Sequence, residues 1–180
     1  MRWRRTAAAV LLVVVAGCGS GPAPAPAPAY GGTDVMFLQM SLAYADQGDR
    51  VAGPVVRRAA DPRLRALAAE MREQCRAEAR TMRDWLTGWR QPPSADPAAG
   101  AHAGHGGLHS LRDADIAELT AARGGDFDRT AVGLLLGHLH RGVEVSRMES
   151  AGGRYPPARE LADRMTAARQ AWIRRLLALA

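Results

Sequence analysis

The stretch from Asp61 to Trp89, DPRLRALAAEMREQCRAEARTMRDWLTGW, sets the expected fold. Asp61 can cap a helix, and Pro62 suits the first helical turn because its missing N–H would have no partner there. The stretch therefore predicts a long helix with one buried face, which ends before Pro92-Pro93. Its apolar positions recur close to the helical period of 3.6 residues: Leu64, Leu67, Ala68, Met71, Cys75, Met82 and Leu86.

Helices are also expected on both sides of this stretch, because the chain is rich in alanine and leucine and has few β-branched runs outside its first residues. One helix begins at Thr33 or Asp34, which can both cap, and Gly53-Pro54 can bend it. Asp126 can cap a later helix that follows the breaker Gly124-Gly125. The expected ranges are 33–60, 110–123, 127–150 and 158–179.

The helices form two copies of one unit. Asp34-Val-Met-Phe37 leads one helix and Leu67-Ala-Ala-Glu-Met71 lies in the next. In the second half, Phe127-Asp128 leads a helix and Leu161-Ala-Asp-Arg-Met165 lies in the next. A helical hairpin used twice predicts an all-α four-helix bundle, with a short extra helix and a histidine-rich loop between the hairpins.

The first residues are typical of an export signal. Three arginines precede an uncharged stretch from Thr6 to Val15, and Val15-Ala16-Gly17-Cys18 resembles a bacterial lipobox. Residues 1–17 are expected to be a lipoprotein signal peptide, with lipid on Cys18 holding the protein to the extracytoplasmic face of the cell membrane. An ordinary signal peptide with a chance cysteine is the alternative. Residues 18–32 read as a Pro/Ala-rich tether, and residues 33–180 as one domain.

The charge and the cysteine content limit which partners and cross-links are expected for this protein. The formal net charge of +6 falls to +3 once the three arginines of residues 1–17 are removed. The remaining arginines alternate with acids along the helices. The chain has no basic motif interleaved with aromatic residues, so a nucleic-acid partner is not expected. Only Cys75 remains besides Cys18, so no intramolecular disulfide is expected. Cys75 is either a half-buried small residue or a reactive or ligating thiol.

The loop between the hairpins holds three of the five histidines, namely His102, His105 and His109. Imidazoles at such spacing can gather a borderline metal ion such as copper or zinc. Ordering a loop opposes binding, so the affinity would be modest. The alternative is a polar linker with no ligand.

Four residues on the helices are further candidate ligands. His138 and His140 are two positions apart on a helix and point about 200° from each other, so they cannot chelate one ion together. His140 shares a face with Glu144, either as part of a site or as a surface pair. Met36 and Met40 are one turn apart, and thioethers suit Cu(I) or Ag(I), although methionine at helical spacing also fills cores.

Catalysis is not expected. A di-iron bundle requires Glu-x-x-His motifs on two helices, and the chain contains none. It also lacks a nucleophile elbow, a phosphate-binding glycine loop and a paired-cysteine zinc motif.

These motifs together resemble the bacterial domain-of-unknown-function family 305. Asp34 to Met40 fits the opening of the family's first hairpin, while Tyr44-Ala45 occupies its first His-His pair. His138 falls on the first position of the second pair, and Leu139 on the second position. The resemblance implies a ferritin-like fold over residues 34–180, and some members are linked to binding copper or silver through histidine and methionine.

Two functions remain open at this stage. The first is weak binding or buffering of a transition metal outside the membrane, through the loop histidines with His138 or His140. The second is a non-catalytic interaction or structural module of the cell envelope that has lost an ancestral metal site.

Overall fold

The computed structural model describes residues 29–94 and 111–180. Its helices are α1 (Gly32–Arg58), α2 (Pro62–Gly88), α3 (Asp113–Ala121), α4 (Gly124–Gly152) and α5 (Pro156–Leu177). All regular secondary structure in these two ranges is helical, which confirms the predicted all-α bundle of two hairpins with a short extra helix. The expected signal peptide, Cys18 and the three loop histidines lie outside the described residues.

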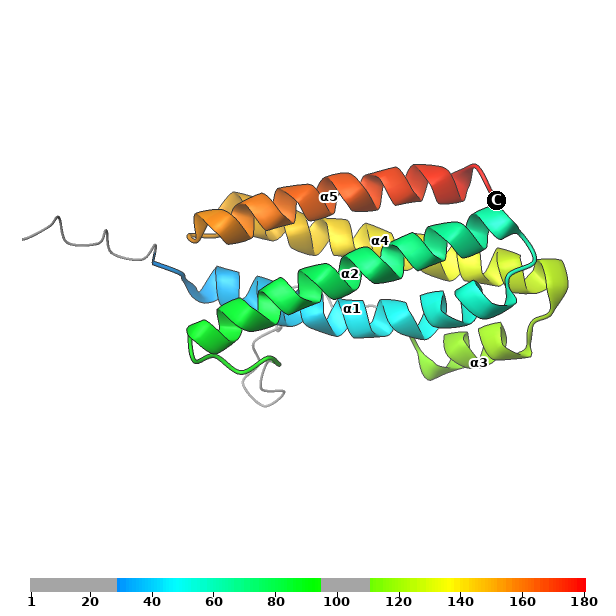
Figure 1. Ribbon diagram of the computed structural model, residues 1–180, viewed down its shortest axis with the longest axis horizontal. Coiled ribbons are helices and arrows are strands. Elements are labelled where there is room, and N and C mark those ends of the chain that lie inside the picture. The colour runs from blue at the N-terminus through cyan, green and yellow to red at the C-terminus, as the bar shows by residue number, and fades with distance from the viewer. Residues whose placement is uncertain (1–28, 95–110) are drawn as a thin grey trace, which may run out of the picture.

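The four long helices lie side by side in a bundle, and α3 packs on its outside (Figure 1). Within the bundle, α1 packs against both α2 and α4, and α4 packs against α5. The helices α2 and α5 make far fewer close backbone approaches to each other. Hydrogen bonds between side chains also connect α2 and α5. Glu70 of α2 accepts hydrogen bonds from Trp172 at 2.9 Å and from Arg175 at 2.7 and 2.8 Å.

The start of α2 is as the sequence predicts. Asp61 caps it, with the Arg63 backbone N–H donating to Asp61 Oδ1 at 2.7 Å. Two other starts differ. The cap of α1 is Gly31, and Asp34 lies in the first turn, where its carboxylate accepts the Gly31 N–H at 2.6 Å. Helix α4 begins at Gly124, whose φ of +52° suits glycine, so the expected breaker forms the first turn of the helix.

The core of the bundle is divided into two apolar clusters. One lies toward the α3 end and contains Phe127, Leu135 and Trp172. The other contains Phe37, Met82 and Leu86, and lies toward the start of α1. Both clusters are fully buried at these residues, so each provides the hydrophobic stabilisation that holds the helices together. Polar side chains, including Glu78 and Arg169, are buried between the two clusters.

None of the described helices is long and apolar enough to cross a membrane.

Candidate functional site: a pocket between the two hairpins

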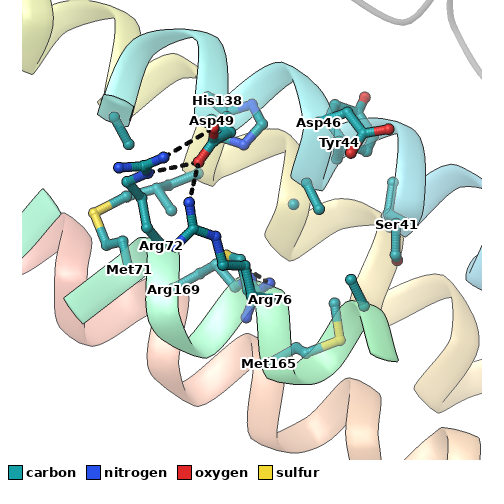
Figure 2. Close-up of a pocket in the computed structure, with 18 of the residues that line it drawn as sticks. Ser41, Tyr44, Asp46, Asp49, Met71, Arg72, Arg76, His138, Met165 and Arg169 are labelled. Atoms are coloured by element: carbon teal, nitrogen blue, oxygen red, sulfur yellow. Dashed lines mark hydrogen bonds and ion pairs between the residues drawn. The ribbon is translucent and has the colours of Figure 1, made fainter. Parts of the chain in front are cut away.

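A pocket of about 410 Å³ lies between the two core clusters and is lined by all four long helices (Figure 2). Ala52, Met71 and Leu139 of the first cluster line it, and Ala79 and Met165 of the second cluster line it as well. A pocket of this size between the helices of a bundle is a common position for a small ligand. We therefore take this pocket as the candidate site.

His138 lines the pocket from α4 and packs against α1. Its ring lies edge-on to the ring of Tyr44, with 5.7 Å between the ring centroids. A Cβ placed on Gly48 would lie 2.6 Å from His138 Nε2, so only glycine leaves room for the imidazole to come this close to α1. Burial, assisted by the positive charge of Arg169, lowers the pKa of His138 to about 4. The ring is therefore neutral at pH 7, which is the form that binds metals.

Three sulfur-bearing side chains line the same pocket, namely Met71, Cys75 and Met165. Burial raises the pKa of the Cys75 thiol to about 11, so the group stays protonated at neutral pH. This agrees with the half-buried cysteine that was one of the two expectations. The two thioethers carry no proton and can act as soft ligands at any pH.

A buried ion pair crosses the pocket wall. Arg169 of α5 donates to both oxygens of Glu78 on α2, at 2.8 and 2.6 Å. Its guanidinium also lies 3.8 Å from Cys75 Sγ. Because both side chains of the pair are more than nine-tenths buried, water cannot replace either partner. The pair therefore engages the Glu78 carboxylate and holds the Arg169 guanidinium next to Cys75, so Glu78 is not available to balance the charge of an added cation.

The mouth of the pocket is bordered by charged side chains of α1 and α2. Arg72 makes a two-bond contact with Asp49, at 2.6 Å from Nε and 3.2 Å from Nη2. Arg76 lies 3.8 Å from the same carboxylate, and Arg83 lies 4.0 Å from Asp46. The bond from Arg72 outweighs partial burial and lowers the pKa of Asp49.

The structure separates the predicted ligands that it describes. His140 is exposed, and its Nδ1 donates to the Leu136 carbonyl at 2.7 Å. Met40 is buried in the second core cluster, and Met36 packs against the same cluster. Of the four helix candidates, only His138 lines the pocket. Across residues 29–94 and 111–180, no group of three or more His, Cys, Asp or Glu side chains is placed to hold a metal ion.

Besides His138, Cys75 is a pocket residue that the sequence already offers as a possible ligand, and the internal repeat contains a usable signal for other residues of the pocket. Met71 and Met165 end the matching segments of the two copies, and both line the pocket. Tyr44 and His138 hold matching positions in the first helix of each copy, and their rings touch. Superposing the copies would have brought these residues to one level of the bundle.

The fold and the pocket define a class of protein: an all-helical bundle of two repeated hairpins with a pocket between the hairpins. The family model described as domain of unknown function (DUF305) matches residues 34–180. The chain belongs to this family. No relative is found among curated proteins.

Solved structures share the fold. A DUF305 fragment from Deinococcus radiodurans is 25% identical, with a TM-score of 0.70, covering 84% of this chain and 97% of the other. A putative secreted DUF305 protein from Streptomyces coelicolor is 20% identical, with a TM-score of 0.75 and coverages of 82% and 91%. CopM, solved in a Cu(I)-bound form, is 19% identical, with a TM-score of 0.66 and coverages of 81% and 94%.

Proposed function

We propose that this protein is a lipid-anchored extracytoplasmic protein that binds a copper-class metal ion weakly and catalyses no reaction. The observation that carries the proposal is the grouping of one neutral imidazole and two thioethers, from His138, Met71 and Met165, around one pocket. These groups need no deprotonation at pH 7, and imidazole with thioether suits Cu(I) or Ag(I).

The similarity to CopM supports the choice of metal. CopM has been solved with Cu(I), with Cu(II) and with silver, and its fold matches this chain over most of both lengths. At this level of identity the similarity establishes the fold alone, so the ligands have to come from this chain's own residues. The expected anchor at Cys18 and the export signal before it are part of the same proposal.

Weak binding follows from the charges in the pocket. Arg169 stands next to Cys75 and lowers the pKa of His138 together with burial, so an added cation meets an unfavourable field there. Arg169 engages the Glu78 carboxylate, so this group is not free to bind a metal. The same features oppose general acid–base catalysis, because a pKa of about 4 makes the His138 imidazole a weak base at neutral pH and arginines engage the pocket's carboxylates.

A second candidate function is a non-catalytic interaction module of the cell envelope. The favouring observation is that Tyr44 is buried at a position where the family resemblance expects a histidine, while Leu139 belongs to the apolar core. Under this alternative, the pocket carries no metal and His138 serves packing.

Calorimetric titration with Cu(I) under reducing conditions, and with Cu(II) and Zn(II), tests the proposal. The protein is the mature chain with Cys18→Ser, so that the free thiol cannot bind metal. Met71→Leu/Met165→Leu and His138→Gln test the pocket. The matched controls are Met36→Leu/Met40→Leu and His140→Gln, which remove the same groups from other places. A His102→Ala/His105→Ala/His109→Ala variant tests the loop.

The proposal expects saturable Cu(I) binding that weakens in the pocket variants and persists in the matched controls. Loss in the loop variant alone would move the metal site to the histidine-rich loop. Heats no larger than dilution for all three metals would refute metal binding and favour the interaction module.

A further inference from the structure

The pocket mouth carries more positive than negative charge. Five arginines line the pocket against two acids, Asp46 and Asp49, and even with Glu78 behind Arg169 the balance stays positive. Four of these arginines lie on α2, at Arg72, Arg76, Arg80 and Arg83. Spacings of three and four residues place side chains on one face of a helix, so the four form a row along the mouth.

This arginine row is only partly neutralised. The Asp49 carboxylate forms ion pairs with Arg72 at 2.6 Å and with Arg76 at 3.8 Å, while Asp46 and Arg83 are 4.0 Å apart. Arg80 is exposed and has no ion pair in the described part of the chain, so the middle of the row lacks a counter-charge. Like charges one turn apart on a helix repel each other and destabilise it. An anion bound at the row would remove this repulsion.

The inner part of the pocket has the opposite character. Apart from His138 and the paired Arg169, it is lined mainly by apolar side chains, among them Met71, Ala79, Leu139 and Met165. A ligand that reached from the arginine row to these residues would place a charged group at the mouth and an apolar body between the two core clusters. Guanidinium groups bind carboxylates through paired, charge-assisted hydrogen bonds, which fixes the orientation of such a ligand.

We propose that this pocket binds a small amphiphilic carboxylate, with its head at Arg76 and Arg80 and its apolar chain against Met71 and Met165. Membership of the family does not by itself imply this carboxylate site, and the proposed metal binding does not require it. The carboxylate and the proposed metal ion would compete for this pocket, because the chain contacts Met71 and Met165, but the head group contacts arginines that are not candidate metal ligands.

The test uses NMR of the mature chain with Cys18→Ser, labelled with ¹³C at the methionine methyl groups and kept metal-free with EDTA. Decanoate is titrated, beside acetate, which has the head without the chain, and decanol, which has the chain without the charge. The methyl groups of Met71 and Met165 report on the pocket. Those of Met36 and Met148, which do not line it, are internal controls.

The expected result is a saturable shift of the Met71 and Met165 methyl signals with decanoate alone. Arg76→Gln/Arg80→Gln should weaken this binding by about tenfold or more, since charge-assisted hydrogen bonds are lost. The matched control is Arg147→Gln/Arg174→Gln, which removes the same charge from exposed positions outside the pocket and should leave the affinity unchanged.

Three results would overturn the proposal. Decanol could bind as tightly as decanoate, which would reduce the pocket to an apolar cavity. The two double variants could weaken decanoate binding equally, which would indicate a general charge effect. Vesicles containing phosphatidylglycerol could shift the methyl signals while free decanoate does not, which would assign the arginine row to a lipid surface. Because every titration is metal-free, failure of the metal proposal does not affect any of these outcomes.

Discussion

Two regions of the bundle bury charged groups in opposite ways. At the pocket, Glu78 of α2 faces Arg169 of α5, and the two opposite charges hold each other. At the end of the bundle where α1 begins, Asp34 and Glu149 are two carboxyl groups with no solvent exposure, and each affects the ionisation of the other. In the first region two opposite charges are paired, whereas in the second the buried Asp34 favours the protonated form of Glu149.

The pKa values of the two carboxyl groups are shifted in opposite directions. Burial opposes the charge on Asp34, but hydrogen bonds from the Tyr155, Gly31 and Arg154 backbone and from Glu149 outweigh it and lower the pKa of Asp34. Burial, with the neighbouring Asp34, raises the pKa of Glu149 to about 8. Asp34 is therefore the acceptor that joins α1 to the α4–α5 turn, and the neighbouring Glu149 keeps its proton at neutral pH.

Breaking the ion pair should have the largest effect. Arg169→Leu leaves Glu78 buried without its partner and should lower the free energy of unfolding by about 3–5 kcal/mol, measured by urea denaturation at pH 7. The double variant Glu78→Leu/Arg169→Leu should recover most of this loss, because no unpaired charge remains. Arg63→Leu, which breaks the exposed pair with Asp61, is the control. Equal losses from Arg169→Leu and Arg63→Leu would contradict the account.

Removing the acceptor at the other region should cost less. Asp34→Ala leaves the backbone N–H groups of Gly31, Arg154 and Tyr155 without their partner and should lower the free energy of unfolding by about 1–3 kcal/mol. Hydrogen exchange should accelerate at Arg154 and Tyr155 more than in the middle of α4. If exchange at both residues stayed as slow as in the wild type, the proposed junction would be wrong.

The sequence predicts best those features that depend on residues close together in the chain. Asp61-Pro62 starts α2 as expected, and the two-hairpin repeat gave the bundle. Asp34 was expected to cap α1, but its main partners are the backbone groups of residues 154 and 155, far along the chain. Arg169 belongs to a helix whose charges alternate, a pattern typical of a solvated face. The burial of Arg169 depends on its contact with Glu78 on another helix, and the charge pattern along α5 does not show that contact.

The pH dependence should separate the two regions. The folded pKa of Glu149, about 8, lies above its usual value, so its contribution is complete at acid pH and is lost as the pH rises toward 8. His138 has a lowered folded pKa and acts oppositely, but only below about pH 6.5. Between pH 6.5 and 8.5 the free energy of unfolding should therefore fall by about 1 kcal/mol or more.

Thermal or urea unfolding across this pH range, with Glu149→Gln beside the wild type, measures the effect. The variant should show a flat profile, while Glu144→Gln, which changes an exposed acid on the same helix, should keep the fall. A wild-type stability that stays constant or rises from pH 6.5 to 8.5 would show that Glu149 is already ionised.

The smallest effect is expected at the contact of α1 with the pocket. Gly48→Ala should gain helix propensity but displace the His138 ring, so the net change in stability should be below about 1 kcal/mol. The pKa of His138, followed by NMR titration, should rise from about 4 toward its usual value as the ring moves to a wetter position. Gly133→Ala, where nothing lies within 4 Å of the added Cβ, should leave this pKa unchanged.

The most direct test of the metal proposal is a crystal structure of the domain soaked with a silver salt, with silver located by its anomalous scattering. We expect a silver ion in the pocket, bonded to His138 and to the sulfur of Met71 or Met165. Silver bound only at exposed His140 or at the loop histidines, with the pocket free of it, would contradict the account.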